Sequence, residues 1–207
     1  MRIYMSASGT EKNNLIKENG FGLVYSPYNM ISERLDIPYI LDNGAFTAYS
    51  KNIPWNPDLF YKAVNKYKNY DFVVIPDIVA GGESSLKLSI KHLDRLNHPR
   101  YLAVQNGISG GDCLKFVPHI DGIFIGGDMI WKLREADYWC NFAHNHGLKC
   151  HIGRVGTETL YDWAIQIGAD SVDGSTPVRH DKIHLVNNWI DSFRFQMRFS
   201  KPQDNSS

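Results

Sequence analysis

Two aspartates in this chain follow short apolar runs and stand beside small residues, a setting suited to nucleophilic or acid–base chemistry. Asp173 lies within segment 168–179, where a proline and an arginine come soon after the carboxylate. Asp42 likewise ends an apolar run and precedes Asn43 and Gly44. Two carboxylates can divide the work, because one can attack an electrophilic carbon while the other transfers protons. Since these aspartates are far apart in sequence, the fold must bring them together.

Short β-rich runs alternate with helical stretches along the whole chain. Near-continuous apolar runs are typical of parallel strands that are covered on both faces. The predicted strands are 3–6, 22–25, 39–42, 72–76, 101–105, 122–125, 149–152 and 171–173. Helices are expected at 56–69, 84–96, 130–146, 157–168 and 183–199, with brief ones near 10–18, 30–35 and 110–117. Eight predicted strands that alternate with helices predict an α/β fold, a compact (β/α)8 TIM barrel.

The length and composition fit one catalytic domain over residues 1–200, followed by a polar tail at 201–207 that we expect to be disordered. A chain of 207 residues with 43% apolar content can bury a sizeable core. Because barrels of this type have about 200 to 250 residues or more, several loops must be short. The alternative is a doubly wound open sheet.

The overall charge and the cysteine pattern limit the classes of partner and compartment. Lys plus Arg and Asp plus Glu both number 22, so global charge does not indicate a nucleic-acid binder. No stretch approaches the roughly 20 apolar residues of a membrane span, so no membrane partner is expected. The three cysteines lack CxxC spacing and the eight histidines show no HExxH pattern. We therefore expect a cytoplasmic protein without disulfides and without a metal.

Polar residues gather where six of the predicted strands end. In a barrel these carboxyl ends meet at one mouth, which is where α/β barrels carry their active sites. A single aspartate at such a position is more often a helix cap, so the indication comes from the ordered series. The series is Asp42-Asn43-Gly44, Asp77, Gln105-Asn106-Gly107, Gly126-Gly127-Asp128, Gly153-Arg154 and Asp173-Gly174.

Each of these groups has a physical use if the ligand is a purine. Asp77 could accept hydrogen bonds from a base amino group and a ring NH. Gln105 offers a donor and an acceptor. Backbone NH groups near Gly126 and Gly127 could donate to a carbonyl, because glycine permits close approach. Phe46 could stack on the base. The aspartates at the ends of the third and eighth strands then remain free for work at the sugar.

In chain order, these segments resemble the motifs of the tRNA-guanine transglycosylases. Asp-Asn-Gly-Ala-Phe at 42–46 resembles the family's Asp-Ser-Gly-Gly-Phe/Tyr, and Val-Gln-Asn-Gly at 104–107 resembles its Val-Gln-Gly-Gly. Ile-Gly-Gly at 125–127 resembles its glycine turn, and Arg-Val-Gly at 154–156 resembles its Gly-Val-Gly. The segment 173–179 resembles its Asp-Cys-Val-x-Pro-Thr-Arg.

The family consists of (β/α)8 barrels that exchange a guanine base for a 7-deazaguanine. The resemblance implies that Asp173 is the nucleophile on C1′ of the sugar and that Asp42 is the second catalytic acid. It further implies that Phe46 stacks on the base, that Asp77 reads the guanine edge and that the glycine turn contacts the base. No redox cofactor is implied.

The departures from the family pattern point to a particular branch. The tRNA-acting members hold a structural zinc through three cysteines and a histidine after the nucleophile, whereas no cysteine follows Arg179 here. We therefore expect neither zinc nor the zinc-binding insertion. The chain looks like the shorter relatives that insert 7-deazaguanines into DNA, in bacterial cells or phage-infected hosts. The resemblance predicts a DNA-guanine transglycosylase with a preQ0-like base as partner, and tRNA as the alternative substrate.

Three further alternatives stay open at the level of sequence. Arg179 could bind a phosphate beside the flipped nucleotide, or it could pair with a neighbouring acid. The roles of Asp42 and Asp173 could be reversed, because sequence alone does not orient carboxylates. The chain could also be another small-molecule barrel enzyme, or a nucleic-acid-binding module without catalytic activity.

Overall fold

The structure, a computed structural model, describes residues 1–6, 8–29 and 36–199. Its eight strands are all parallel and form a closed barrel in sequence order, with β8 pairing back onto β1. The predicted (β/α)8 architecture is therefore confirmed, and the open-sheet alternative is wrong. The helix expected near 30–35 and the tail at 201–207 lie outside the described residues.

All eight predicted strands are present, with ends that differ by up to two residues. They are β1 Arg2–Ser6, β2 Gly22–Tyr25, β3 Tyr39–Leu41, β4 Val73–Val74, β5 Arg100–Val104, β6 Gly122–Ile125, β7 Lys149–Ile152 and β8 Ser171–Gly174. The strand β4 is shorter than its apolar run, which ends at Pro76, a residue that cannot donate a backbone hydrogen bond.

Most helices also lie where the sequence places them. They are α1 Thr10–Glu18, α2 Ala45–Ser50, α3 Pro57–Lys66, α4 Glu83–Leu93, α5 Gly110–Cys113, η1 Leu114–His119, α6 Met129–Asn145, α7 Glu158–Gln166, α8 Thr176–Arg179, η2 Ile183–Leu185 and α9 Val186–Phe199. The helices α2 and α8 were not predicted, because one or two turns are too short to show helical periodicity. Each begins three residues after a candidate catalytic aspartate, Asp42 or Asp173.

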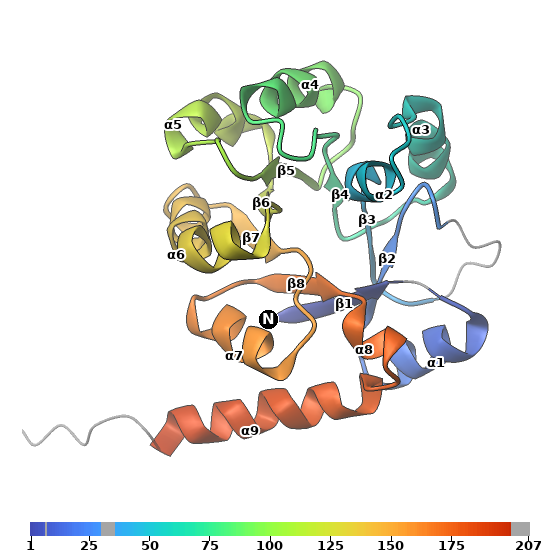
Figure 1. Ribbon diagram of the computed structural model, residues 1–207, viewed down its shortest axis with the longest axis vertical. Helices are drawn as coiled ribbons and strands as arrows, with labels where there is room; N and C mark the ends of the chain where they lie inside the picture. The colour runs from blue at the N-terminus through green and yellow to red at the C-terminus, as the bar shows by residue number, and fades with distance from the viewer. Residues whose placement is uncertain (7, 30–35, 200–207) are drawn as a thin grey trace, which may run out of the picture.

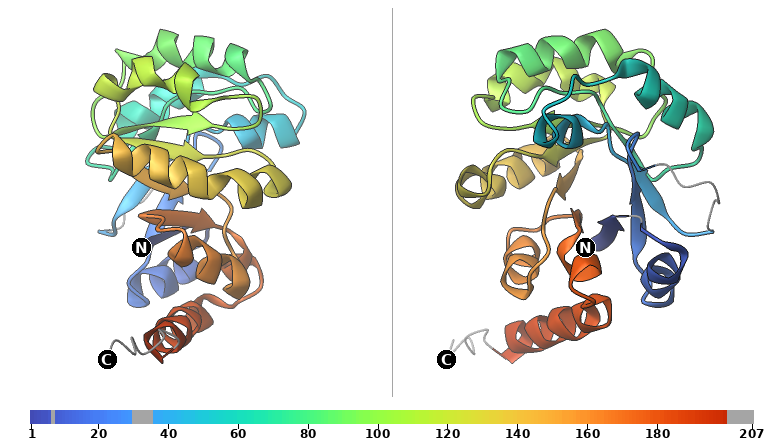
Figure 2. Two further views of the ribbon diagram at one scale, coloured as in Figure 1. Left: turned by 90° about the vertical axis from the view of Figure 1, so that its left-hand side faces the viewer. Right: turned by 45° about the vertical axis from the view of Figure 1, so that its right-hand side comes forward.

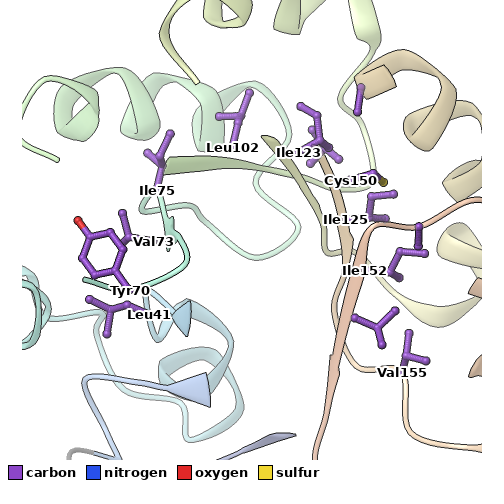
Figure 3. Close-up of a cluster of buried hydrophobic side chains, with 14 of the residues drawn as sticks. Leu41, Tyr70, Val73, Ile75, Leu102, Ile123, Ile125, Cys150, Ile152 and Val155 are labelled. Atoms are coloured by element: carbon purple, nitrogen blue, oxygen red, sulfur yellow. The ribbon is translucent and has the colours of Figure 1, made fainter. Parts of the chain in front are cut away.

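The helices surround the barrel, and α9 lies outside that ring against α7 (Figures 1 and 2). Alternate strand residues such as Leu102 and Ile123 point away from the barrel axis into the buried layer beneath the helices (Figure 3). The other residues fill the barrel interior, where the rings of Phe72 and Tyr101 stack with centroids 3.8 Å apart. No helix in the described part of the chain is long and apolar enough to cross a membrane.

We expect Gly174→Ala to destabilise the fold severely. A Cβ at Gly174 would lie 2.0 Å from the carbonyl oxygen of Val155, in the loop that follows β7. This backbone cannot yield easily, because the Val155 NH donates to the Asp173 carbonyl at 2.6 Å. Overpacking of this kind costs about 3 kcal/mol or more, or roughly 10 °C in melting temperature. Gly9→Ala is the control, since nothing lies within 4 Å of its Cβ position. Equal melting temperatures for the two variants would contradict the prediction.

Candidate active site

The carboxyl ends of the strands surround a cavity of about 910 Å³. It opens at the mouth of the barrel, above the aromatic side chains that fill the interior. Every residue to which the sequence assigned a catalytic or binding role lies in its lining: Asp42, Phe46, Asp77, Gln105, Gly126, Gly127, Asp173 and Arg179. The barrel thus brings together groups separated by up to 137 positions in the chain, as the strand-end argument requires.

Asp42 is held at the end of β3 by its own backbone and by the turn that begins α2. Its NH donates to the Tyr25 carbonyl at 2.8 Å, and its Oδ2 accepts from the Gly44 NH at 2.9 Å. Gly44 adopts φ 79°, a left-handed conformation that favours glycine. Burial raises the pKa of Asp42 to about 7, and the nearby charges of Asp173 and Asp77 act in the same direction. This carboxyl can therefore both give and take a proton near neutral pH.

Asp77 follows β4 and is held by two amide side chains. Asn43 Nδ2 donates to its Oδ1 at 2.8 Å, and Gln105 Nε2 donates to its Oδ2 at 3.1 Å. Burial raises the pKa of Asp77 to about 6, while these two hydrogen bonds oppose the shift. Each carboxylate oxygen keeps acceptor capacity, so two donors from a ligand edge can still be bound.

Asn43 also lines the cavity, and its contacts could not be predicted from the sequence. Besides binding Asp77, its Nδ2 donates to the Ile75 carbonyl at 2.9 Å, and its Oδ1 accepts from the Ala45 NH at 2.8 Å. The Trp55 indole NH donates to its backbone carbonyl at 2.8 Å. Because this buried side chain is fully hydrogen-bonded, it fixes Asp77 relative to the start of α2.

Gln105 lines the cavity, but most of its hydrogen-bonding groups are used within the protein. Its Oε1 accepts from the Ala80 NH at 2.6 Å, and its Nε2 donates to the Ile78 carbonyl as well as to Asp77. The side chain is 3% exposed. The geometry therefore indicates that Gln105 orients Asp77. For a direct contact with a ligand, the Gln105 side chain keeps only the remaining acceptor capacity of Oε1.

Asp173 is held at the end of β8 by a histidine. His151 Nε2 and Asp173 Oδ2 are 2.9 Å apart, and the imidazole is completely buried. The Arg154 NH donates to Oδ1 of Asp173 at 3.3 Å. His151 packs inside the barrel, and it also binds the candidate nucleophile. The apolar neighbours Cys150 and Ile152 face outward, so strand alternation was the signal that places His151 inside the barrel.

A cation covers the aromatic ring at the rim of the cavity. The Arg154 guanidinium carbon lies 4.5 Å from the centroid of Phe46, and the guanidinium donates to the Gly127 carbonyl. The loop that carries Arg154 is held in place by a hydrogen bond from the buried Lys132 ammonium to the Gly153 carbonyl. A base that stacks on this face of Phe46 must first displace the guanidinium, whose exposed side chain can move.

Arg179 is the last residue of α8 and lines the cavity. Among the described residues, no acid forms an ion pair with it, whereas the neighbouring Asp181 pairs with Lys12 at 3.0 Å. The alternative of a salt bridge to a nearby acid therefore finds no support in the described structure. The arginine is exposed and available to an anion.

The described residues contain no group of three or more His, Cys, Asp or Glu side chains that could hold a metal ion. His144 and His146 stand two positions apart, but they bind the Asp170 carboxylate and the Phe142 carbonyl respectively. Among the aspartates that line the cavity, Asp42 and Asp173 form the pair suited to acid–base and nucleophilic chemistry. One has a pKa near neutrality and the other is fixed by a buried imidazole.

Comparison with known proteins adds no identification. A scan against protein-family models found no match, and a search of curated protein sequences found none either.

Proposed function

We propose that this chain is a guanine transglycosylase that exchanges guanine in DNA for a 7-deazaguanine base such as preQ0. One observation carries the proposal: Asp42 and Asp173 line the same cavity, and burial, with a smaller contribution from the charge of Asp173, raises the pKa of Asp42 to about 7. Such a pair suits a reaction in which one carboxylate attacks and the other moves protons in both directions. The preference for DNA rests on the resemblance to the shorter relatives.

The arrangement around Asp77 supports a guanine-like ligand. Guanine presents an amino group and a ring NH on one edge, and both are donors. The two oxygens of Asp77 are aligned by Asn43 and Gln105, so they can accept from both donors at once. A carboxylate held in this way selects against adenine, which lacks the ring NH donor. The same edge is present in 7-deazaguanines, so one site can accept both the leaving base and the incoming base.

In the first half of the proposed reaction, a guanine flips out of its stack into the cavity, which costs a few kcal/mol. The carboxylate of Asp173 attacks C1′ while the bond from C1′ to the guanine nitrogen breaks. Asp42, in its protonated form, supplies the proton that lets guanine leave as a neutral base. The products are free guanine and a glycosyl ester of Asp173, with Asp42 ionised.

In the second half, a 7-deazaguanine occupies the site that guanine vacated. Asp42 removes the proton from its ring nitrogen, and that nitrogen attacks C1′ as the bond to Asp173 breaks. Asp173 recovers its carboxylate and Asp42 recovers its proton, so the enzyme returns to its starting state. Two inversions at C1′ give net retention, as in retaining glycosidases.

The direct test is base exchange with purified protein. DNA and tRNA that carry labelled guanine are incubated separately with preQ0. The expected result is release of label from DNA, with a 7-deazaguanine found in its place. Release from tRNA alone would move the assignment to the alternative substrate. Release from neither, with protein shown to be folded, would contradict the proposal.

We expect Asp77→Asn to weaken binding of guanine or preQ0 by about 10- to 100-fold, because an amide NH₂ replaces one of the two acceptors. In the wild-type chain, binding should also weaken as the pH falls through about 6, where Asp77 becomes protonated. Calorimetry between pH 5 and 8 measures both effects. Asp94→Asn, at an exposed position that ends α4, is the matched control. A pH-independent affinity in the wild-type chain would contradict the assigned role.

A further inference from the structure

His151 is the only fully buried histidine among the described residues, and it lies beside the candidate nucleophile. It projects from β7 into the barrel, between the side chains of Ser171 and Asp173 on β8. Its Nδ1 is 2.8 Å from Ser171 Oγ, and its Nε2 is 2.9 Å from Asp173 Oδ2. Both ring nitrogens therefore have a partner, and the imidazole joins two groups that face the same way along one strand.

Aromatic side chains fix the orientation of this imidazole. The ring of Phe124 stacks on it at a centroid distance of 4.9 Å and an interplanar angle of 18°. Phe72 meets it edge-on at 5.1 Å, and Tyr4 lies 6.1 Å away. Because the ring is enclosed on these sides, it cannot turn to exchange partners or take up hydrogen bonds from solvent.

The partners also determine where the imidazole proton lies. An ionised carboxylate only accepts hydrogen bonds, so Nε2 must carry a proton to bind Asp173. A serine hydroxyl can donate, so Ser171 can supply the hydrogen bond that a neutral Nδ1 accepts. The contact with the carboxylate therefore places a proton on Nε2, whichever way the Ser171 hydroxyl points.

This arrangement makes the two oxygens of Asp173 unequal. Oδ2 is engaged by the buried ring, while the one donor to Oδ1 among the described residues is the backbone NH of Arg154 at 3.3 Å. A nucleophilic oxygen must be free to approach carbon. Oδ1 is the freer of the two oxygens, because no side chain donates a hydrogen bond to it among the described residues. The contact with His151 also fixes the rotation of the carboxylate, and the accuracy of attack depends on that rotation.

We propose that His151 is a positioning residue that makes Oδ1 of Asp173 the attacking atom. The inference rests on the proposed function and adds a residue to it. As the bond from Oδ1 to C1′ forms, Oδ2 becomes the carbonyl oxygen of the ester and keeps its hydrogen bond. When that bond breaks in the second half-reaction, the electron pair returns to the carboxylate and Nε2–H stabilises the restored charge. The proton stays on His151 throughout.

The test compares two substitutions at His151 that differ in one property. His151→Gln keeps an NH donor within reach of Asp173, whereas His151→Met fills similar space without a donor. The measurement is the rate at which the full-length chain forms a covalent adduct with DNA in a single turnover, read by denaturing electrophoresis. We expect His151→Met to slow adduct formation by about 10- to 100-fold and His151→Gln to recover most of that loss.

Binding and a second histidine supply the controls. The affinity for free preQ0 should stay within about twofold in both variants, because the Asp77 contacts are separate from β7 and β8. His144→Met removes a comparable contact, 2.9 Å from Asp170, at the opposite end of β8 and should leave the adduct rate unchanged. An adduct rate in His151→Met equal to wild type would overturn the inference. Equal slowing in the Met and Gln variants would also overturn it, because loss of packing alone would then explain the effect.

A measurement on the resting protein separates this inference from the proposed function. Nuclear magnetic resonance of ¹⁵N-labelled histidine reports which ring nitrogen carries the proton. The expected result is Nε2–H, with a shift of that signal in Asp173→Asn. A ring protonated on Nδ1 alone would overturn the inference even if base exchange occurs. Failure of the wild-type chain to form an adduct with DNA or tRNA would instead contradict the proposed function.

Discussion

Asp173→Asn is expected to reduce base exchange by about 10³-fold or more and to abolish the covalent adduct. Asparagine has the same shape, but its amide is a poor nucleophile and cannot form the glycosyl ester. The asparagine amide has an acceptor oxygen on one side and a donor NH₂ on the other. The hydrogen bond of 2.9 Å from His151 Nε2–H is therefore kept only if the amide oxygen points toward the imidazole. Exchange of labelled guanine, with mass spectrometry of the intact protein, measures both losses.

The controls for this prediction address the alternative assignment of the two acids. Asp173→Asn should melt close to the wild-type temperature and bind free preQ0 normally, because the Asp77 site is intact. If Asp173→Ala kept full exchange activity while Asp42→Ala lost it, the roles would be reversed. An adduct that maps to Asp42 by peptide sequencing would lead to the same conclusion.

The second large effect concerns Asp42 and its pH dependence. The first half-reaction needs the protonated carboxyl, and the pKa of this group is raised to about 7. As the pH rises through about 7, the protonated fraction falls, so the rate of adduct formation should decrease by about tenfold for each pH unit above it. The second half-reaction needs the ionised form and should show the opposite trend. Overall exchange should therefore be greatest near neutral pH.

Asp42→Asn should remove this pH dependence as well as lower the rate. General acid–base catalysis contributes about 10²- to 10⁴-fold, so a loss in that range is expected for the variant. Single-turnover adduct formation between pH 5.5 and 9 measures the profile of each chain. A wild-type rate that stays flat across this range, or a variant that keeps the same profile, would show that another group supplies the proton.

The raised pKa also has a consequence for stability. A carboxyl whose pKa is higher in the folded chain than in the unfolded chain binds more protons when folded. Between the unfolded value of about 4 and the folded value of about 7, rising pH therefore lowers the free energy of unfolding. The site is thus maintained against a stability cost, which is common where function requires a perturbed group.

The sequence by itself determined the architecture and which of the candidate residues share one cavity. Eight apolar runs with helices between them predict the barrel, because parallel strands need cover on both faces. Polar residues at the ends of these strands predict which residues line the mouth, because closing the barrel gathers all the carboxyl ends in one place. These inferences depend on local pattern and on a general rule of topology, so they need no knowledge of individual contacts.

Only the tertiary structure decided how the site residues are connected. His151 on β7 binds Asp173 on the neighbouring strand β8. Asn43 binds Asp77, which lies 34 positions later in the chain. The Arg154 guanidinium, which follows β7, covers the ring of Phe46, which follows β3. Such contacts depend on the register between strands and on the burial of each group. The pKa of about 7 at Asp42 has the same origin, since it arises from desolvation and from acids that are distant in sequence. A sequence gives the types of these groups, but distances and burial exist only once the barrel has closed.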